Sequence, residues 1–212
     1  MGTSFVFATS AASSRARSED RAEVFAYEDS LIVVVADGAG GVAGGAVASD
    51  ALVDAVRARI GERPFDPYDI RAWSDVLIAA DADLARGKNT GETTAIVVVV
   101  GFHGVVGVSV GDSEAWVVGQ RHDRLTEKQD RARVGTGRSR PTPFHRRSLE
   151  GVLLVATDGL FKNARGDSIT ARCTGDVSDI AKKLVELPRL RSGAYPDDVA
   201  VVVVTIPRTT SP

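Results

Sequence analysis

Acidic side chains stand beside the apolar runs of this chain. They lie one or two residues after three of the runs and directly before a fourth, and another acidic pair precedes a weaker run around Val24. In chain order they are Glu19 with Asp20, Asp37, Asp112, Asp158, and Asp197 with Asp198. If neighbouring runs form antiparallel strands, the end of one strand and the start of the next share one sheet edge. The sequence therefore predicts that these carboxylates gather at one rim.

A rim of this kind predicts metal chemistry. Carboxylates held close together repel one another, and burial strengthens the repulsion, so cations are needed to neutralise them. Oxygen ligands without Cys or His partners favour Mg²⁺ or Mn²⁺. Two such ions roughly 3.5–4 Å apart form a recurring centre for phosphoryl hydrolysis. Each aspartate alone is equally explained as a cap on a strand or turn, and only the whole set favours the metal site.

A glycine cluster follows the first of these strands. The sequence after Asp37 is Gly-Ala-Gly-Gly, and Gly38–Ala43 also fits a loose dinucleotide-binding pattern. That alternative requires a second parallel strand soon after the next helix. Here Gly44–Ile60 is followed instead by two prolines and another helical pattern. The glycines are better explained by close approach of the backbone to an ion or a phosphate group.

Short apolar runs rich in Val and Ile predict the strands that position these acids. The strong runs are Leu31–Ala36, Ile96–Val100, Val105–Val110, Val152–Ala156 and Val199–Ile206, and the weaker ones are Phe5–Ala8, Val24–Tyr27 and Ala115–Val118. Most strong runs do not alternate with polar residues, which indicates that both faces of each strand are covered. The connections around residues 101–104 and 111–114 are too short for parallel crossovers, so these strands are antiparallel hairpins.

Helical spacing of apolar residues predicts three helices, at Gly44–Ile60, Tyr68–Arg86 and Val177–Leu187. Amphipathic helices covering the outer faces of antiparallel sheets give an α+β fold, a four-layer α-β-β-α sandwich. No linker divides the chain, so residues 1–212 are expected to form a single domain.

One stretch, residues 121–147, shows little apolar periodicity. It holds six arginines between Arg131 and Arg147, together with Gly135, Gly137, Pro141 and Pro143. It is expected to be a mobile surface loop. Its arginines are either simply solvated or dock an acidic phosphosubstrate.

The composition limits the class of protein. The chain has 212 residues, with 26 Lys and Arg against 28 Asp and Glu, and a net charge of −2. Near-neutral charge argues against nucleic acid as an obligate partner. The single Cys173 excludes an intramolecular disulfide and is expected to be a buried apolar residue. With no apolar run long enough to cross a bilayer and no basic segment within residues 1–14, we expect a cytoplasmic protein without a membrane partner.

Ordered motifs along the chain resemble the metal-dependent, PP2C-like serine/threonine phosphatases (the PPM family). They are Arg15-Ala16-Arg17-Ser18-Glu19-Asp20, Asp37-Gly38-Ala39-Gly40-Gly41, Gly91-Glu92-Thr93-Thr94-Ala95, Gly111-Asp112-Ser113, Leu125-Thr126, Thr157-Asp158-Gly159-Leu160 and Asp197-Asp198-Val199. The resemblance spans about Arg15 to Val204 and implies the same α-β-β-α sandwich. It also implies an enzyme that hydrolyses phosphoserine and phosphothreonine in proteins with a water molecule activated by Mg²⁺ or Mn²⁺.

The resemblance also assigns roles to residues. Asp37 would bridge two metal ions, with Glu19 and the Gly38 carbonyl holding one, and Asp158 with Asp197 holding the other. Asp112 would share a weaker third ion with Asp158, and Asp20 would act through water. Arg15 would bind the substrate phosphate through a charge-assisted fork.

Three residues depart from the family pattern. Ala39 stands where many members have a histidine, Lys162 where many have an acid, and Asp198 where an asparagine is usual. Lys162 would weaken the third-ion site or replace its charge, and Asp198 would add a negative charge beside Asp197. Ala39 and Lys162 motivate an alternative: a weak or inactive regulator that binds a phosphoprotein or a kinase. The enzyme's partners would be phosphoprotein substrates and a serine/threonine kinase, and we expect a monomer. His103, His122 and His145 are expected to be solvated, and Trp73 and Trp116 to be core residues.

Overall fold

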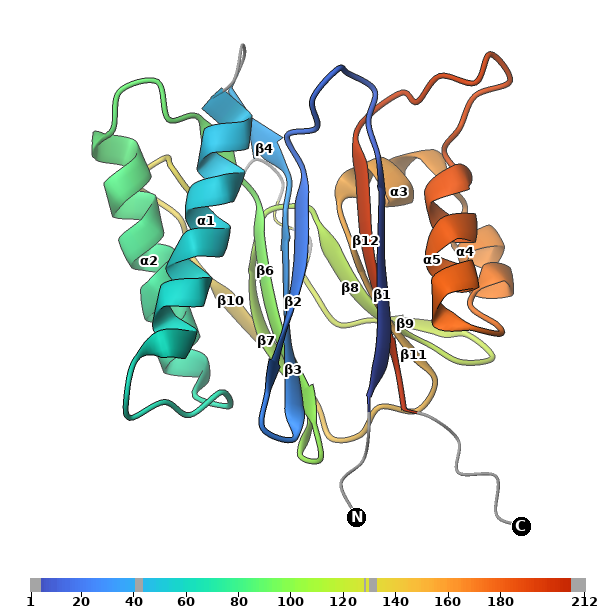
Figure 1. The fold of residues 1–212 in the computed structure, drawn as a ribbon, viewed down its shortest axis with the longest axis horizontal. Coiled ribbons are helices and arrows are strands. Elements are labelled where there is room, and N and C mark those ends of the chain that lie inside the picture. Colours follow the sequence, from blue (N-terminus) through green and yellow to red (C-terminus); the bar gives the residue numbers. More distant parts are fainter. Residues whose placement is uncertain (1–4, 41–43, 128, 130–132, 207–212) are drawn as a thin grey trace.

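Two five-stranded antiparallel sheets lie face to face between helices in the computed structural model (Figure 1). The structure describes residues 5–40, 44–127, 129 and 133–206. Predictions that involve residues 1–4, Gly41, Val42, Ala43 or Arg131 lie outside this part of the chain. The predicted α+β sandwich is confirmed.

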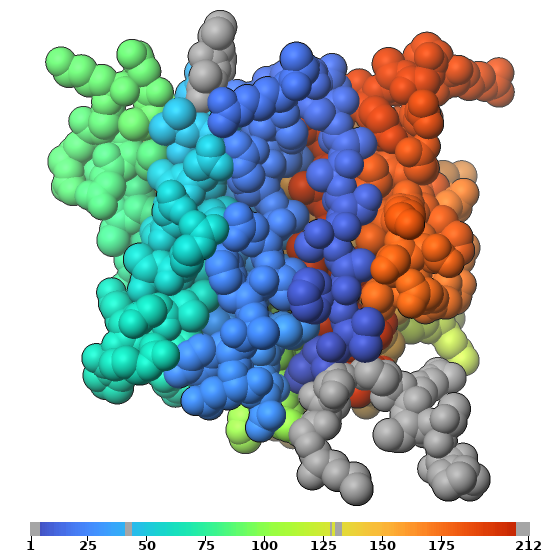
Figure 2. Space-filling view, in the orientation of Figure 1, coloured from blue at the N-terminus to red at the C-terminus, as the bar shows by residue number. Residues whose placement is uncertain are grey.

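The first sheet has the order β1-β12-β11-β8-β9. Its strands are β1 (Val6–Ala12), β12 (Val199–Thr205), β11 (Val152–Ala156), β8 (Glu114–Val118) and β9 (His122–Arg124). β1 pairs with β12 from Val6↔Thr205 to Ala12↔Val199. The N-terminal strands therefore lie against elements from the C-terminal third, as the blue and orange regions of Figure 2 show.

The second sheet has the order β10-β7-β6-β3-β2. Its strands are β10 (Thr142–Arg146), β7 (Gly104–Val110), β6 (Ala95–Gly101), β3 (Ser30–Ala36) and β2 (Arg21–Tyr27). The short strands β4 (Gly38–Ala39) and β5 (Glu92–Thr93) form a separate two-stranded sheet. β4 directly follows Asp37, so this small sheet lies beside the predicted rim.

Helices cover the outer face of each sheet (Figure 1). They are α1 (Gly44–Gly61), α2 (Ile70–Arg86), α3 (Asp158–Asn163), α4 (Gly166–Arg172) and α5 (Val177–Glu186). α1 and α2 pack on the second sheet, and α3, α4 and α5 pack on the first. The side chain of Asp69 caps α2 by accepting from the backbone amides of Arg71 and Ala72. In the described part of the chain, no helix is long and apolar enough to cross a bilayer.

The unbroken apolar runs are explained by burial on both faces. In β3, Leu31, Val33 and Val35 face the core between the sheets. Ile32 and Val34 face α1 and α2. The strand is therefore buried along its whole length, as the lack of alternation predicted.

The prediction of one loop over residues 121–147 is wrong at both of its ends. β9 pairs with β8, and β10 pairs with β7, each at the edge of its sheet. β10 contains Pro143, which an edge strand tolerates because its missing amide faces away from the ladder. Within β10 only Phe144 is buried, so the apolar pattern of a strand is almost absent.

The predictions for the two tryptophans, the cysteine and the three histidines are confirmed. Trp73 is 1% and Trp116 is 7% exposed, and Cys173 is buried at the end of α4. His103, His122 and His145 are exposed. His122 also stacks on Trp116 with ring centroids 4.2 Å apart.

Candidate metal centre

Three of the predicted carboxylates come together at one end of the sandwich. Asp37 lies between β3 and β4, Asp112 follows β7, and Asp158 begins α3. Each offers one carboxylate oxygen, and these oxygens all lie within 4.8 Å of one another. Strand ends from both sheets therefore meet at one rim, as the sequence predicted. The antiparallel hairpin predicted around residues 111–114 is wrong, because this short connection passes from β7 in the second sheet to β8 in the first.

Asp37 is the most strongly perturbed of the three. Burial raises the pKa of Asp37 to about 7, and the negative charge of Asp158 contributes further. Asp197 and Asp112 also raise this pKa, whereas the positive charge of Arg133 lowers it. Burial and the neighbouring charges thus favour the protonated form of Asp37 more than in an exposed aspartate.

Asp20 is a further buried carboxylate near this group, and it is 7% exposed. Burial raises its pKa to about 8, and the charges of Asp37, Asp198 and Asp158 add to the effect. Among the residues that the structure describes, no group donates a hydrogen bond to its buried Oδ2. A buried carboxylate oxygen without a donor requires water or a cation to satisfy it.

Lys162 pairs with two members of the cluster. Its Nζ lies 3.0 Å from Asp112 Oδ2 and also donates to Asp158 Oδ2. Burial raises the pKa of Asp112, but the hydrogen bond and charge of Lys162 outweigh it and hold that pKa below its usual value. Burial also raises the pKa of Asp158, and there Lys162 offsets only part of the increase.

Hydrogen bonds to Thr94, in the segment between α2 and β6, hold the backbone of Asp37 in place. The amide of Asp37 donates to Thr94 Oγ1 at 2.9 Å, and the amide of Thr94 donates back to the Asp37 carbonyl at 2.9 Å. Thr94 Oγ1 also lies 2.7 Å from Ser113 Oγ, next to Asp112. Two carboxylates of the cluster are therefore supported through one buried threonine.

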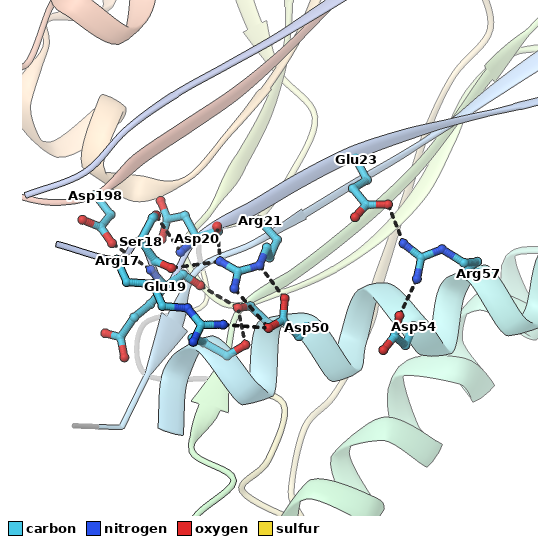
Figure 3. Close-up of polar contacts among 12 residues, drawn as sticks. Arg17, Ser18, Glu19, Asp20, Arg21, Glu23, Asp50, Asp54, Arg57 and Asp198 are labelled. Carbon is cyan, nitrogen blue, oxygen red and sulfur yellow. Dashed lines mark hydrogen bonds and ion pairs between the residues drawn. The ribbon is translucent and has the colours of Figure 1, made fainter. Parts of the chain in front are cut away.

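The turn that carries Arg15 and Glu19 is fixed by Asp198. Asp198 Oδ1 accepts from the Ser13 hydroxyl at 2.8 Å and from the Ser14 amide and hydroxyl at 2.8 and 3.0 Å. Its Oδ2 accepts from the Glu19 amide at 2.9 Å (Figure 3). Burial raises the pKa of Asp198, but these donors outweigh it and hold the pKa below its usual value.

A second anchor holds the other side of this turn. Arg21 Nη1 donates to the carbonyls of Ser18 and Asp20, both at 2.9 Å. Its Nε donates to Asp50 Oδ1 on α1 at 2.5 Å (Figure 3). The turn thereby connects β2, α1 and the residues before β12.

Close backbone contact joins this turn to β4 and α1. A Cβ placed on Gly38 would overlap the Gly45 carbonyl oxygen and lie 2.8 Å from the Glu19 carbonyl oxygen. One placed on Gly45 would lie 2.8 Å from Glu19 Oε1. Only glycine fits here, so Glu19 and Gly38 are held side by side without an intervening side chain.

A further segment, residues 133–139, lies across the rim. Asp81 of α2 accepts three backbone amides, from Gly135 at 2.7 Å, Gly137 at 2.9 Å and Ser139 at 2.9 Å. Val134 pairs with Thr93 in both directions, and Arg133 Nη1 lies 3.5 Å from the Asp37 carbonyl oxygen. Arg133 therefore brings a positive charge to the site.

The other predicted site residues are less tightly grouped. Glu19 and Asp197 lie outside the trio of oxygens within 4.8 Å in the described residues. Arg15 pairs with Glu19, and the Arg15 side chain is 57% exposed. Asp197 is linked to the site by its charge, which raises the pKa of Asp37.

Sequence reasoning missed Asp81 and did not predict the contacts of Asp198 and Lys162. Asp81, Asp198 and Lys162 each act through partners distant in the chain, and their roles depend on which donors or acceptors the fold brings to them. The departure of Lys162 from the family pattern indicated a weakened third-ion site or a replacement of its charge. That of Asp198 indicated only an added negative charge beside Asp197. Asp81 lay unmarked within a helical pattern.

The donor set fits a hard divalent cation. It consists of carboxylate oxygens and the Gly38 carbonyl, and Asp20 contributes a buried oxygen without a partner in the described chain. Burial raises the pKa values of Asp20 and Asp37, and the neighbouring carboxylates add to this, so a bound cation would stabilise their charged forms. These features match the oxygen ligands that Mg²⁺ and Mn²⁺ prefer.

Comparison with known proteins supports the fold. No protein-family model matches the chain, and neither does any curated protein. A solved bacterial serine phosphatase is 20% identical, with a TM-score of 0.84 over 99% of this chain and 100% of its own. Stp1 of Staphylococcus aureus, a serine/threonine phosphatase, is 21% identical, with a TM-score of 0.83 over 96% of this chain and 94% of its own.

A third solved structure is the catalytic domain of the serine/threonine phosphatase PstP in complex with two manganese ions. It is 24% identical, with a TM-score of 0.73 over 95% of this chain and 98% of its own. The chain therefore has the fold of bacterial serine/threonine phosphatases. This is the fold that the motif resemblance implied.

Proposed function

We propose that the protein is a metal-dependent phosphatase that hydrolyses phosphoserine and phosphothreonine in proteins. The observation that carries the proposal is the meeting of Asp37, Asp112 and Asp158 within 4.8 Å on a fold shared with serine/threonine phosphatases. Clustered carboxylates on such a scaffold have a direct use in phosphoryl transfer.

Two Mg²⁺ or Mn²⁺ ions are proposed for the rim. Asp37, Glu19 and the Gly38 carbonyl would hold one, and Asp37, Asp158 and Asp197 the other, while Asp20 would act through water. Bound ions of this kind polarise phosphoryl oxygens and make water more acidic. The chain's own task is to keep these oxygens in place, and the Thr94 and Asp198 hydrogen bonds serve it.

Arg15 is proposed as the phosphate-binding residue. It stands four residues before Glu19, and its side chain reaches solvent at the edge of the site. A guanidinium forms two parallel hydrogen bonds to a phosphate group and stabilises the charge on its oxygens. Ala39 offers no proton for the leaving serine or threonine oxygen, so solvent would supply it.

The remaining predictions concern context. We propose phosphorylated proteins as substrates and a serine/threonine kinase as the opposing partner. A cytoplasmic, monomeric protein without nucleic-acid or membrane partners is part of the same proposal. Docking of an acidic substrate by the exposed Arg138 and Arg140 predicts a KM that rises with salt and loses this dependence when both are replaced.

The test uses p-nitrophenyl phosphate and a phosphothreonine peptide with Mn²⁺, before and after EDTA. We expect EDTA, Asp37→Asn and Asp158→Asn each to abolish turnover. Asp54→Asn, on the exposed face of α1, is the matched control and should retain parental activity. Turnover that persists in EDTA and in both site variants would refute the proposal.

A second candidate is a regulator without turnover. The observation that favours it is the pairing of Lys162 with Asp112 and Asp158, which neutralises part of the proposed site. This candidate predicts negligible hydrolysis together with phosphoprotein or kinase binding that EDTA does not change. Fluorescence anisotropy with a labelled phosphopeptide separates the two candidates.

A further inference from the structure

A lysine ammonium lies between two of the three clustered carboxylates. Lys162 Nζ is 3.0 Å from Asp112 Oδ2 and forms an ion pair with Asp158 Oδ2. The Asp158 side chain is 6% exposed and that of Asp112 is 17% exposed. Both acceptors are therefore shielded from solvent, and the ammonium is the cation they share.

Helix α3 positions the Lys162 ammonium next to both carboxylates. Asp158 and Lys162 are separated by one turn of α3 and so lie on the same face of the helix. Asp112 comes from the connection between β7 and β8. The ammonium thus links the two sheets at the rim, in addition to neutralising charge.

The ammonium remains charged under all physiological conditions. A lysine ammonium ordinarily loses its proton only near pH 10.4, and here it donates to two carboxylates. A cation attached to the chain acts at high local concentration and does not depend on the supply of free metal.

We propose that the Lys162 ammonium takes the place of a divalent cation between Asp112 and Asp158. The chain would then hold one divalent ion fewer than the same carboxylates would bind without the lysine. This inference deepens the proposed function, because it assigns a built-in cation to the Asp112 side of the site and leaves Asp37 for exchangeable metal.

The reason is competition for the same oxygens. An ion that bridges Asp112 and Asp158 must first displace Nζ from both carboxylates. The displaced ammonium remains attached one helical turn from Asp158, on a side chain that is 55% exposed. Its positive charge still repels a cation at these oxygens, although solvent screens part of the repulsion. Removal of the ammonium both frees the oxygens and restores their full negative charge.

The test counts Mn²⁺ bound per chain. Electron paramagnetic resonance of free Mn²⁺ at neutral pH gives the number of sites without any need for activity. We expect Lys162→Met to bind one Mn²⁺ more per chain than the parent protein. Lys162→Arg, which keeps the positive charge, should show the parental number. Lys182→Met, an exposed lysine on α5, is the matched control and should also show it.

A double variant locates the additional ion. Lys162→Met combined with Asp112→Asn should return to the parental number of Mn²⁺ ions. The inference is overturned if Lys162→Met binds the parental number of Mn²⁺ ions, or if the additional ion persists in the double variant. Thermal unfolding of each variant in EDTA verifies that the protein is folded.

The result is independent of the phosphatase proposal. If the parent hydrolyses no phosphoester, the proposed function fails, while a gain of one Mn²⁺ in Lys162→Met still supports the inference. If the parent is active and the number of ions is unchanged in Lys162→Met, the inference fails and the proposed function stands.

Discussion

At the scale of single residues, the identity of a side chain matters beyond its charge. Asp198 accepts four hydrogen bonds on its two oxygens. An ionised carboxylate can do this because both of its oxygens are acceptors and neither is a donor. An asparagine would direct an NH₂ group toward a donor. The acid at this position is therefore explained by the serine-rich turn it holds.

The first prediction concerns Asp198→Asn. Loss of an acceptor facing a buried amide should lower the free energy of unfolding by about 1–3 kcal/mol. It should also weaken Mn²⁺ binding, because the turn that carries Glu19 becomes loose. Urea unfolding and Mn²⁺ titration measure the two effects. Asp54→Asn provides the exposed control, and equal stability of the two variants would contradict the prediction.

The second prediction concerns Arg15→Lys. An ammonium cannot form the paired hydrogen bonds of a guanidinium, and the lost charge-assisted contact corresponds to about a 10–100-fold decrease in kcat/KM. The same substitution at the exposed Arg86 should leave kcat/KM unchanged. Steady-state kinetics with a phosphopeptide decides, and parental kcat/KM in Arg15→Lys would remove this residue from the proposed site.

At the scale of elements, the close approach of β4 to α1 depends on Gly38 and Gly45. We expect Gly38→Ala to abolish Mn²⁺ binding, because its methyl group would overlap the Gly45 carbonyl oxygen and displace Glu19 from its position next to residue 38. Gly61→Ala is the matched control: nothing lies within 4 Å of a Cβ at that helix end. It should stabilise the protein by about 0.5–1 kcal/mol. Isothermal titration with Mn²⁺ measures the difference, and tight binding by Gly38→Ala would contradict it.

Asp81 is expected to hold the segment 133–139 against α2. Asp81→Asn should raise the hydrogen-exchange rates of the Gly135, Gly137 and Ser139 amides, which all donate to this carboxylate. The amides donate to a charged acceptor, so the variant should lose about 1.5–3 kcal/mol of stability. Asp83→Asn, on the same helix, should change neither quantity. Unchanged hydrogen-exchange rates in Asp81→Asn would contradict the prediction that Asp81 holds this segment.

The elements show which information a sequence carries. Runs of Val and Ile predicted the central strands, because a strand buried on both faces is continuously apolar. β9 and β10 were missed because edge strands need few apolar residues: His122–Arg124 are all exposed, and Phe144 alone of β10 is buried. These strands are defined by their backbone pairing, which side-chain hydrophobicity does not reveal.

The candidate site was predictable to a similar degree. Carboxylates beside strand ends indicated which residues would meet, because antiparallel connections return chain ends to the same edge. The partners of those carboxylates were not predictable in the same way. Lys162 and Asp81 reach groups 50 or more residues away, and such pairings depend on the finished packing.

At the scale of the whole molecule, the site opposes folding when metal is absent. Burial raises the pKa of Asp20 to about 8 and that of Asp37 to about 7, while both titrate near 4 in an unfolded chain. The folded state thus binds more protons between about pH 4 and pH 8, so its stability decreases as pH rises through this range.

The corresponding prediction is a change in Tm. In EDTA, Tm should fall between pH 5.5 and pH 8.5, by about 2–4 °C for each kcal/mol lost. Mn²⁺ should raise Tm more at pH 8.5 than at pH 5.5, since it replaces the protons. The variant with Asp20→Asn and Asp37→Asn should show a smaller decrease with pH. An equal decrease in this variant would contradict the explanation.

The pairing of β1 with β12 has a consequence for synthesis on the ribosome. β12 lies between β1 and β11 in its sheet, and Asp198 immediately before it fixes the turn that bears Glu19. A nascent chain that has exposed every earlier strand still lacks the strand that joins β1 to the rest of this sheet. The proposed centre can therefore assemble only after residues 198–205 emerge from the exit tunnel, so partly made chains are expected to be without function.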